Sequence, residues 1–281
     1  MNIRLMSNNQ WLCDQNHPFW LERGMDCSAA VREEGFAEFY RQTQPDVIGL
    51  QEVSALMLEH LMRNLQALAL RYGMVWGRDT PILYRCDRLD LVDSGFLIYP
   101  GEVPGQAGNF NNHDSKSYSW AVFRDKTTGN MFCFMSTHLW WKSDDPNDVN
   151  YQLGSGAARV YQMSLAIRQM DLLLLQYNCP QIIVGDFNTP YHSAPIREAR
   201  KNGFLHSHDL ALDHADKTNG WHPCGPSILE PYVPQPFEEG IDHILVRNAP
   251  DSFVRCFQRS MPDFYLPLSD HAPVWIDAEW G

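Results

Sequence analysis

Short apolar segments recur along the whole chain, and they constrain its fold more than any other feature of the sequence. Each is a few residues long, rich in Val, Ile, Leu or Phe, and bounded by turn-forming residues, as is typical of buried β-strands. A chain with so many short strands must bury them in packed sheets. We predict strands at residues 3–7, 46–50, 74–76, 82–85, 89–98, 119–124, 131–139, 181–184, 241–246 and 274–278.

Three other stretches carry their apolar residues at helical spacing. Residues 29–43 end shortly before Pro45, and two further helices are predicted at about 58–68 and about 157–176. The combination predicts an α/β fold in which two mostly antiparallel sheets pack face to face with helices outside.

The remaining organisation is simple. Neither an internal repeat nor a clear linker divides the chain, so we expect one domain over residues 1–281. Residues 100–118 are rich in Gly, Asn and Pro, and residues 221–237 carry five prolines among aromatic residues. Both stretches are expected to be long loops with a functional role, because long ordered loops are more often functional than linking.

Composition narrows the class of protein. Hydrophobic content of 44% and charged content of 20% are ordinary for a folded globular chain. The balance of 22 basic against 34 acidic residues leaves a charge of −12, which disfavours a protein that coats duplex nucleic acid. No window is apolar enough for a membrane span, and the N-terminus lacks the layout of a signal peptide. The seven cysteines form no CxxC pair, so we expect reduced thiols in a cytoplasmic protein.

Polar residues stand at the ends of the predicted strands, where buried strands project their terminal side chains onto a shared rim. One Asp or Asn after a strand is usually a turn former. Repetition after so many strands needs another explanation, because Asp and Glu are almost never buried without a partner or a cation. We therefore predict one site formed by Asn9, Glu52, His138, Asp186, Asn188, Asp242, Asp270 and His271.

The residue types in this set indicate the chemistry. Its carboxylates and amides are hard oxygen ligands that suit Mg²⁺ or Mn²⁺ and suit zinc poorly. Its two histidines, His138 and His271, can stabilise developing charge or move protons near neutral pH. Neither a GxSxG elbow nor a P-loop is present. A hard cation beside donors aimed at an anionic centre is what phosphoryl transfer to water requires.

Taken in order, these motifs resemble those of the endonuclease/exonuclease/phosphatase superfamily, the deoxyribonuclease I-like metal-dependent phosphoesterases. LQE alone would be a weak signal, whereas GDFN followed by SDH at this distance is a strong one. The resemblance covers essentially the whole chain. The segments that carry it are IRLMSNN at 3–9, LQE at 50–52, ILYR at 82–85, STHL at 136–139, GDFNTP at 185–190, IDH at 241–243 and SDH at 269–271.

The resemblance implies a four-layered α/β sandwich with the site at the strand ends. It implies that Glu52 is the main cation ligand, helped by Asn9 and Asp270. It also implies that Asp186 orients or deprotonates the attacking water, while Asn188 binds the phosphate or steadies that carboxylate. Attack would be in line, with no covalent enzyme intermediate.

The same resemblance assigns the groups that contact the phosphate. His271 would touch it while held by Asp242, and His138 and Tyr84 would donate to the non-bridging oxygens. Some relatives have an acid where this chain has Tyr84.

The first strand departs from the family pattern, because Asn8 occupies the place of the usual aromatic residue. We choose Asn9, which shares a strand face with Ile3, Leu5 and Ser7, and Asn8 remains the alternative.

Aromatic residues near these motifs are candidates for substrate binding. Trp140, Trp141 and Trp221 either stack on a base or sugar of the substrate or cover the edge of the sandwich. Arg159, one helical turn from Gln162, either clamps a second phosphate or lies on a solvated helix face.

The predicted function is hydrolysis of a phosphodiester or phosphomonoester. The acidic balance and the lack of a basic stripe favour a phosphorylated small molecule, a sugar or lipid head group, or a short single strand over bulk duplex DNA. No partner protein is indicated. The first alternative is an endonuclease or exonuclease acting on DNA or RNA. The second is a non-catalytic binding protein with the same fold, which would have an eroded site.

Overall fold

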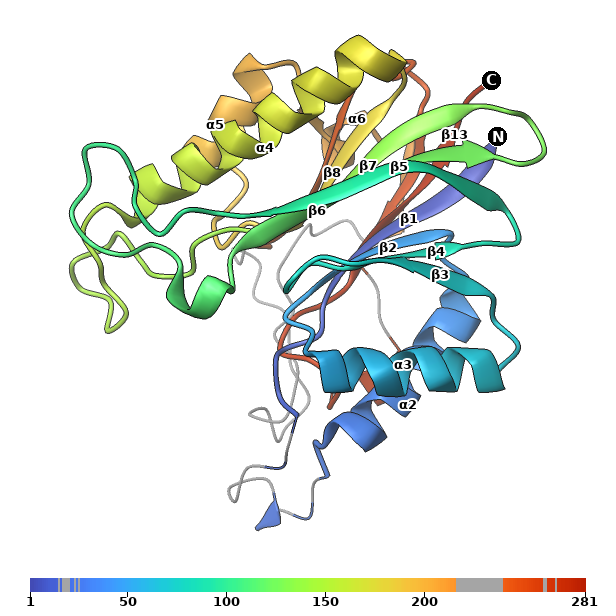
Figure 1. Ribbon diagram of the computed structural model, residues 1–281, viewed down its shortest axis with the longest axis horizontal. Helices are drawn as coiled ribbons and strands as arrows, with labels where there is room; N and C mark the ends of the chain where they lie inside the picture. Colours follow the sequence, from blue (N-terminus) through green and yellow to red (C-terminus); the bar gives the residue numbers. More distant parts are fainter. Residues whose placement is uncertain are drawn as a thin grey trace.

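Two β-sheets lie face to face, and helices cover both outer surfaces of the pair (Figure 1). Helices α2 and α3 lie against one sheet, and α4 and α5 lie against the other. The computed structural model describes residues 1–14, 16, 21, 22, 24, 26–215, 240–259, 262–265 and 267–281. The predicted α/β sandwich of four layers is confirmed.

The first sheet has seven strands in the order β10-β12-β13-β1-β2-β4-β3. Strands β1 and β2 run parallel, whereas β1 is antiparallel to β13 and β2 is antiparallel to β4. Their bounds are β1 Asn2–Asn9, β2 Val47–Gln51, β3 Tyr72–Val75, β4 Ile82–Arg85, β10 Asp213–His214, β12 Val254–Gln258 and β13 Val274–Glu279.

The second sheet has six strands in the order β5-β6-β7-β8-β11-β9. Strands β7 and β8 are parallel, and the other neighbours are antiparallel. Both sheets are therefore mixed: each has a central parallel pair, and the first also has a parallel pair at its edge, β10 with β12. Their bounds are β5 Leu89–Ile98, β6 Ser117–Asp125, β7 Met131–His138, β8 Gln181–Asp186, β9 Leu205–His206 and β11 Asp242–Arg247.

Four main helices complete the outer layers: α2 Ala29–Thr43, α3 Ala55–Ala67, α4 Ser155–Tyr177 and α5 Ala194–Lys201. The hydroxyl of Ser54 caps α3 by accepting a hydrogen bond from the backbone N–H of Met57. Among the described residues, no helix combines the length and the apolar character needed to cross a membrane.

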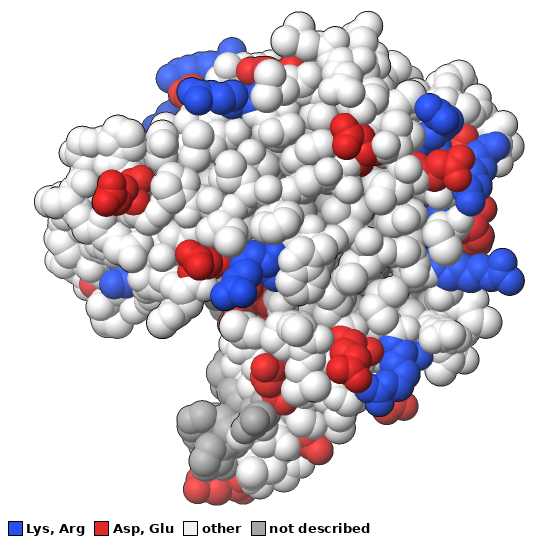
Figure 2. Space-filling model, in the orientation of Figure 1, with Lys and Arg blue, Asp and Glu red and all other residues white. Residues whose placement is uncertain are grey.

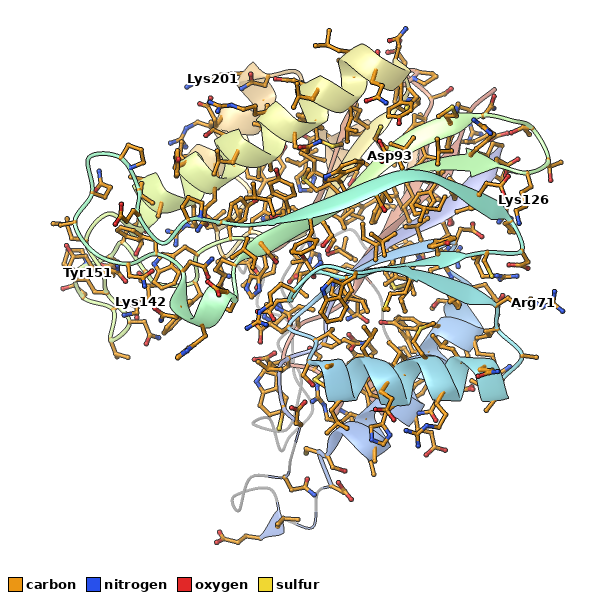
Figure 3. The ribbon with its side chains drawn as sticks, in the orientation of Figure 1. Arg71, Asp93, Lys126, Lys142, Tyr151 and Lys201 are labelled. Carbon is orange, nitrogen blue, oxygen red and sulfur yellow. The ribbon has the colours of Figure 1, made fainter. Side chains whose placement is uncertain are left out.

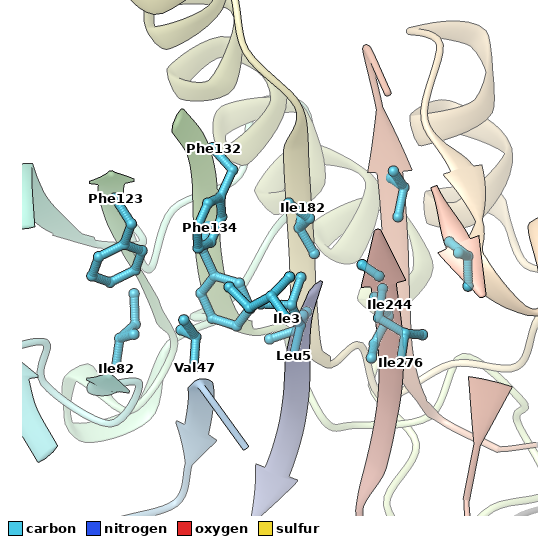
Figure 4. Packing of buried hydrophobic residues seen from close by; sticks show 14 of the residues in the cluster. Ile3, Leu5, Val47, Ile82, Phe123, Phe132, Phe134, Ile182, Ile244 and Ile276 are labelled. Carbon is cyan, nitrogen blue, oxygen red and sulfur yellow. The ribbon is translucent and has the colours of Figure 1, made fainter. Parts of the chain in front are cut away.

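The main core fills the space between the sheets. Ile3 and Leu5 of β1 face Phe134 of β7 and Ile182 of β8, all of them nearly inaccessible to solvent (Figure 4). Burial of each such side chain stabilises the fold by about 1.5–3 kcal/mol. The alternation predicted for the first strand therefore places one of its faces in the core.

The two sheets are in close contact beside their central parallel pairs. A Cβ atom on Gly49 of β2 would lie only 2.5 Å from a methyl carbon of Val184 in β8. Nearby, the hydroxyl of Ser136 donates to the backbone oxygen of Leu50, and the amide of Gln51 donates to Ser136. These hydrogen bonds join the sheets at the same edge of the sandwich, so residues that follow β1, β2, β7 and β8 converge there.

Several elements escaped prediction from sequence. Strand β12 and helix α5 were not predicted, nor were the short elements β9, β10 and α6 Ser207–Leu210. Strand β12 has only Val254 and Phe257 buried among its five residues, and α5 is short. The predicted loop at 100–118 contains η1 Asn112–Asp114 and the start of β6. The predicted loop at 221–237 lies outside the described residues.

Candidate active site

A cluster of carboxylates and imidazoles occupies the edge where the strand ends converge. Glu52 after β2, Asp186 at the end of β8 and His271 before β13 each place one ligand atom within 4.8 Å of the others. The side chain of Asn9, the last residue of β1, lies between them. Its Nδ2 is 3.2 Å from Oε1 of Glu52 and 3.1 Å from Oδ2 of Asp186. Residues from both sheets therefore form one polar centre.

The backbone at this centre adopts conformations that most residues avoid. Glu52 has φ of 56° and Asn188 has φ of 50°, in the left-handed region. A Cβ atom on Gly185 would lie 1.8 Å from the backbone oxygen of Thr137, so only glycine fits there. The turn after β8 is held by the N–H of Asn188, which donates to Oδ1 of Asp186 over 2.7 Å. This turn aims Asp186 and Asn188 at the same place.

His271 is anchored through its other ring nitrogen. Its Nδ1 lies 2.8 Å from Oδ2 of Asp242, the first residue of β11, while its Nε2 lies 3.9 Å from Oδ2 of Asp186. Burial opposes a charge on the ring, but the carboxylates of Asp242 and Asp186 outweigh it and hold the pKa of His271 well above its usual value. His271 is therefore a charged group at this site.

A buried lysine faces the second histidine of the site. Nζ of Lys116 lies 2.6 Å from Nε2 of His138. The same Nε2 of His138 lies 3.4 Å from Oδ2 of Asp186 and 3.7 Å from Oε1 of Glu52. Burial and the charge of Lys116 keep the pKa of His138 well below its usual value. Burial also lowers the pKa of the Lys116 ammonium, and the carboxylates of Glu52 and Asp186 act in the opposite direction.

The prediction from sequence did not include Lys116. The residue belongs to the stretch at 100–118, which has no periodicity and was taken as a loop. One signal was available: Lys116 immediately precedes the strand whose first residue, Ser117, pairs with His138.

Electrostatic interactions at the centre give the two carboxyl groups, Glu52 and Asp186, very different pKa values. Burial alone would raise the pKa of Glu52, but its basic neighbours His138 and Lys116 outweigh it and lower that pKa to about 2. Burial raises the pKa of Asp186 to about 7, and the adjacent Asp242 acts in the same direction. One carboxyl is thus firmly ionised while the other titrates near neutral pH.

The two asparagines at the end of β1 point to opposite faces of the sheet. Asn9 faces the cluster, as predicted from strand register. Asn8 faces the helical layer, where its Nδ2 donates to the hydroxyl of Tyr265 and its Oδ1 accepts from the hydroxyl of Tyr40, both over 2.6 Å. Asn8 therefore supports packing behind the strand.

Comparison with known proteins gives a clear family relationship. The model of the endonuclease/exonuclease/phosphatase family matches residues 28–271. The chain belongs to this family. Membership makes the chain a hydrolase of phosphoester bonds. No curated protein sequence matches the chain.

Solved structures share the fold. A family protein from Bacteroides thetaiotaomicron has a TM-score of 0.74 at 21% identity, covering 99% of this chain and 95% of that one. A mannosyl-6-phosphatase from the same organism has a TM-score of 0.73 at 24% identity, covering 99% and 100%. TDP2 of D. rerio, complexed with a single-strand DNA product, has a TM-score of 0.62 at 16% identity, covering 99% of each chain.

The structure corrects the prediction for Tyr84. This residue pairs with Val47, at the end of β2 farthest from Glu52, and its ring packs 5.0 Å from that of Phe123. Because β4 runs antiparallel to β2, the residues that precede β4 are the ones near the site. One of these is Asp79, whose pKa burial raises to about 6 against the opposing charge of Lys116.

The donor set fits a hard divalent cation. Carboxylate oxygens of Glu52 and Asp186 meet here, and such oxygens are the ligands that Mg²⁺ and Mn²⁺ prefer. Asn9 turns its Nδ2 toward both carboxylates, and its Oδ1 accepts from the backbone N–H of Trp11. Oδ1 of Asp270 is buried and has no hydrogen-bond partner among the described residues. Burial and the nearby Glu52, despite the opposing charge of His271, raise the pKa of Asp270 to about 6. An unpartnered buried carboxylate oxygen is satisfied when a cation binds beside it.

Two predicted substrate-binding residues prove to be structural. Trp140 is completely buried and packs with Phe110 and Ala158, so its ring offers no stacking surface. Arg159 is also buried, and its guanidinium donates to the backbone oxygens of Trp140 and Lys142. Its helix face is therefore neither solvated nor available for a second phosphate.

The remaining candidates differ in placement. Gln162 is buried like Arg159, and it accepts a hydrogen bond from the backbone N–H of Trp140. Trp141 is 40% exposed, with Nζ of Lys142 at 5.7 Å from its ring centroid, so it is accessible to a substrate. Trp221 lies outside the described residues.

Charged residues are interspersed over the surface shown in Figure 2, where neither basic nor acidic side chains form a continuous band. A protein that binds bulk duplex DNA needs a basic stripe to neutralise many phosphates. This face does not provide one.

Proposed function

We propose that the chain is a divalent-metal-dependent phosphoesterase that hydrolyses a phosphodiester or phosphomonoester by in-line attack of water. The observation that carries the proposal is the convergence of Glu52, Asp186 and His271 within 4.8 Å around the amide of Asn9. Such an arrangement combines hard oxygen donors, a group able to accept a proton and a cationic imidazole. The second alternative, a binding protein with an eroded site, has no support from this geometry.

Glu52, with Asn9 and Asp270, would hold Mg²⁺ or Mn²⁺. The low pKa of Glu52 supports this role, because an ionised carboxylate is the form that binds a cation. When bound, the cation stabilises negative charge on the phosphate oxygens.

Asp186 would accept a proton from the attacking water. A pKa raised to about 7 by burial suits a general base that works near neutral pH. Asn188 would keep the carboxylate in position, since its N–H donates to Oδ1 of Asp186. Its Nδ2 also donates to the backbone oxygen of Leu139 over 3.1 Å, which ties the turn to the strand that carries His138.

Three groups would bind the phosphate as charge develops on its oxygens. His271, held by Asp242, would donate from Nε2, and Lys116 and His138 would also contact the phosphate. Donors fixed in advance in a buried site stabilise a developing anion more strongly than water does.

We propose a small or extended single-stranded substrate. The interspersed charges on the face shown in Figure 2 support a phosphorylated small molecule, a sugar or lipid head group, or a short single strand. The mannosyl-6-phosphatase and the TDP2 complex with single-strand DNA represent both kinds of substrate within this fold. Trp141 is the accessible aromatic surface for a sugar or a base.

A phosphoester panel tests the proposal. Bis(p-nitrophenyl) phosphate, p-nitrophenyl phosphate, sugar phosphates, head-group diesters, oligonucleotides and duplex DNA are assayed with Mg²⁺, with Mn²⁺ and with excess chelator. We expect metal-dependent turnover that Glu52→Gln abolishes. The control Glu59→Gln, at an exposed helical ion pair with Arg63, should retain it.

Turnover that survives chelation, or that persists in Glu52→Gln, would reject metal-dependent hydrolysis. Metal binding without turnover on any member of the panel would favour a binding protein. A preference for duplex DNA would establish the nuclease alternative instead.

A further inference from the structure

Two buried histidines outside the catalytic cluster form a chain of hydrogen bonds that ends at the turn after β8. Nε2 of His243 lies 2.8 Å from the backbone oxygen of Thr189, and its Nδ1 lies 3.0 Å from Nε2 of His206. Nδ1 of His206 accepts from the backbone N–H of His208 over 3.2 Å. Both rings are essentially inaccessible to solvent.

The two ends of the chain determine where every proton lies. A carbonyl oxygen only accepts, so Nε2 of His243 must carry hydrogen toward Thr189. Its Nδ1 is then an acceptor, which requires hydrogen on Nε2 of His206. A backbone N–H only donates, so Nδ1 of His206 is bare toward His208. One neutral tautomer of each ring satisfies all three bonds, and an added proton on either ring would break one.

The surroundings keep both rings neutral. Burial lowers the pKa of His243 to about 4, and burial with the adjacent His243 and Arg259 lowers the pKa of His206 well below its usual value. The edge of Tyr191 packs 4.8 Å from the ring of His206. These packed neighbours also leave the rings little freedom to turn.

The hydrogen-bond chain is attached to the catalytic turn at the backbone oxygen of Thr189. The N–H of Phe187 donates to the backbone oxygen of Ile241 at the start of the turn. Beyond it, Asn188 is in the left-handed conformation, which is costly for a residue other than glycine. Thr189 follows directly, and its carbonyl is held by His243, whose neighbour Asp242 anchors His271.

We propose that His206 and His243 are positioning residues of the hydrolytic reaction. By holding the carbonyl of Thr189 they fix the turn that carries Asn188, and so the orientation of the Asp186 carboxylate. The inference rests on the proposed function for its catalytic consequence. The tautomers assigned to His206 and His243 do not depend on the proposed function.

Three variants separate orientation from packing. His206→Phe keeps a ring in the cavity but removes the donor to His243. His206→Gln restores both links, because its amide can donate to His243 and its oxygen can accept from the N–H of His208. His214→Gln is the matched control, since His214 bonds the backbone oxygen of His208 and is not part of the chain.

We expect kcat of His206→Phe to fall about tenfold with KM within about twofold, because a small misorientation of a catalytic group lowers the chemical step. His206→Gln and His214→Gln should stay within about twofold of the parent. Equal kcat in His206→Phe and the parent would overturn the proposal. So would a fall in His206→Gln as large as that in His206→Phe, with both variants equally folded by thermal melting.

Imidazole nitrogen NMR gives a readout independent of activity. The parent should show protonated Nε2 and bare Nδ1 on both residues, unchanged between pH 6 and 9, and His206→Phe should alter the signals of His243. Titration of either ring in that range, or the opposite tautomers, would contradict the proposed chain of hydrogen bonds. A parent that shows these tautomers but hydrolyses nothing would reject the proposed function alone.

Discussion

The two ends of the same β-sandwich handle charge in opposite ways. At the end where β1 and β13 pair near the termini, Asp277 and Asp46 each form an ion pair with a different arginine. Arg4 Nε lies 2.6 Å from Oδ1 of Asp277, and Arg88 Nη1 lies 2.6 Å from Oδ1 of Asp46. Figure 3 marks this end with Lys126 and the catalytic end with Lys142. At this end, which we call the ion-paired end, both carboxylates are therefore neutralised by an arginine.

At the catalytic end, by contrast, several carboxyl groups lie close together without an arginine ion pair among the described residues. Glu52 and Asp186 lie beside the buried Lys116 and two imidazoles, and Oδ1 of the nearby Asp270 has no hydrogen-bond partner among the described residues. Crowded buried carboxyls destabilise the folded state, and proteins tolerate such strain where function requires it. The contrast shows that one end of a β-sandwich can have charges that stabilise the fold while the other end has charges arranged for binding.

The largest effect should come from neutralising the proposed base at the catalytic end. Asp186→Asn keeps the shape of the side chain but cannot accept the proton of water, so kcat should fall about a thousandfold. Steady-state kinetics on the best substrate of the panel measure this. Asp213→Asn, at an exposed position, is the control. A loss below tenfold would show that Asp186 is not the base.

Lys116→Met tests whether the buried cation acts on the substrate. Loss of one preorganised donor to a developing anion should lower kcat/KM about a hundredfold. Lys142→Met, whose ammonium lies beside the exposed ring of Trp141, should change kcat/KM less than threefold. Equal effects of the two substitutions would contradict a special role for the buried lysine.

The pH dependence of stability distinguishes the two ends directly. Asp186 has a folded-state pKa of about 7, above its ordinary value of 3.8, so the folded state binds a proton more tightly than the unfolded state. The stability that this group contributes is present below about pH 4 and is lost as pH rises to about 7.

In excess chelator, Asp186→Asn should therefore melt at a higher temperature than the parent at pH 8, by roughly 8 °C for about 4 kcal/mol. The difference should vanish near pH 4. Calorimetry across this range measures it, and a difference that stays constant with pH would refute the linkage.

The smallest effect on activity should come from a substitution at the ion-paired end. Arg88→Ala removes the ion pair of the buried Asp46, which retains a hydrogen bond from the backbone N–H of Arg4. We expect a loss of about 1 kcal/mol in the free energy of unfolding, or roughly 2 °C in melting temperature, with kcat/KM unchanged. Denaturant unfolding and kinetics check both. A large loss of activity would mean that the two ends are coupled.

Prediction from sequence succeeded where strand periodicity carried the information. The position of Asn9 followed from the alternation of β1, and the residues after β2 and β8 were expected on a common rim. It failed for Tyr84, because the motif did not reveal that β4 runs antiparallel to β2. It failed for Trp140 and Arg159, because proximity to a motif does not reveal which side chains pack inward.

The amino-acid sequence by itself determined which segments become strands and helices and which polar residues end the strands, because these properties are local and periodic. Only the tertiary structure decided which charges meet. Lys116 and Asp79 lie outside the strands, in segments without a repeating pattern, and their place depends on strand order and direction. Burial then sets their electrostatics, since a charge removed from water responds mainly to the few groups that the fold brings beside it.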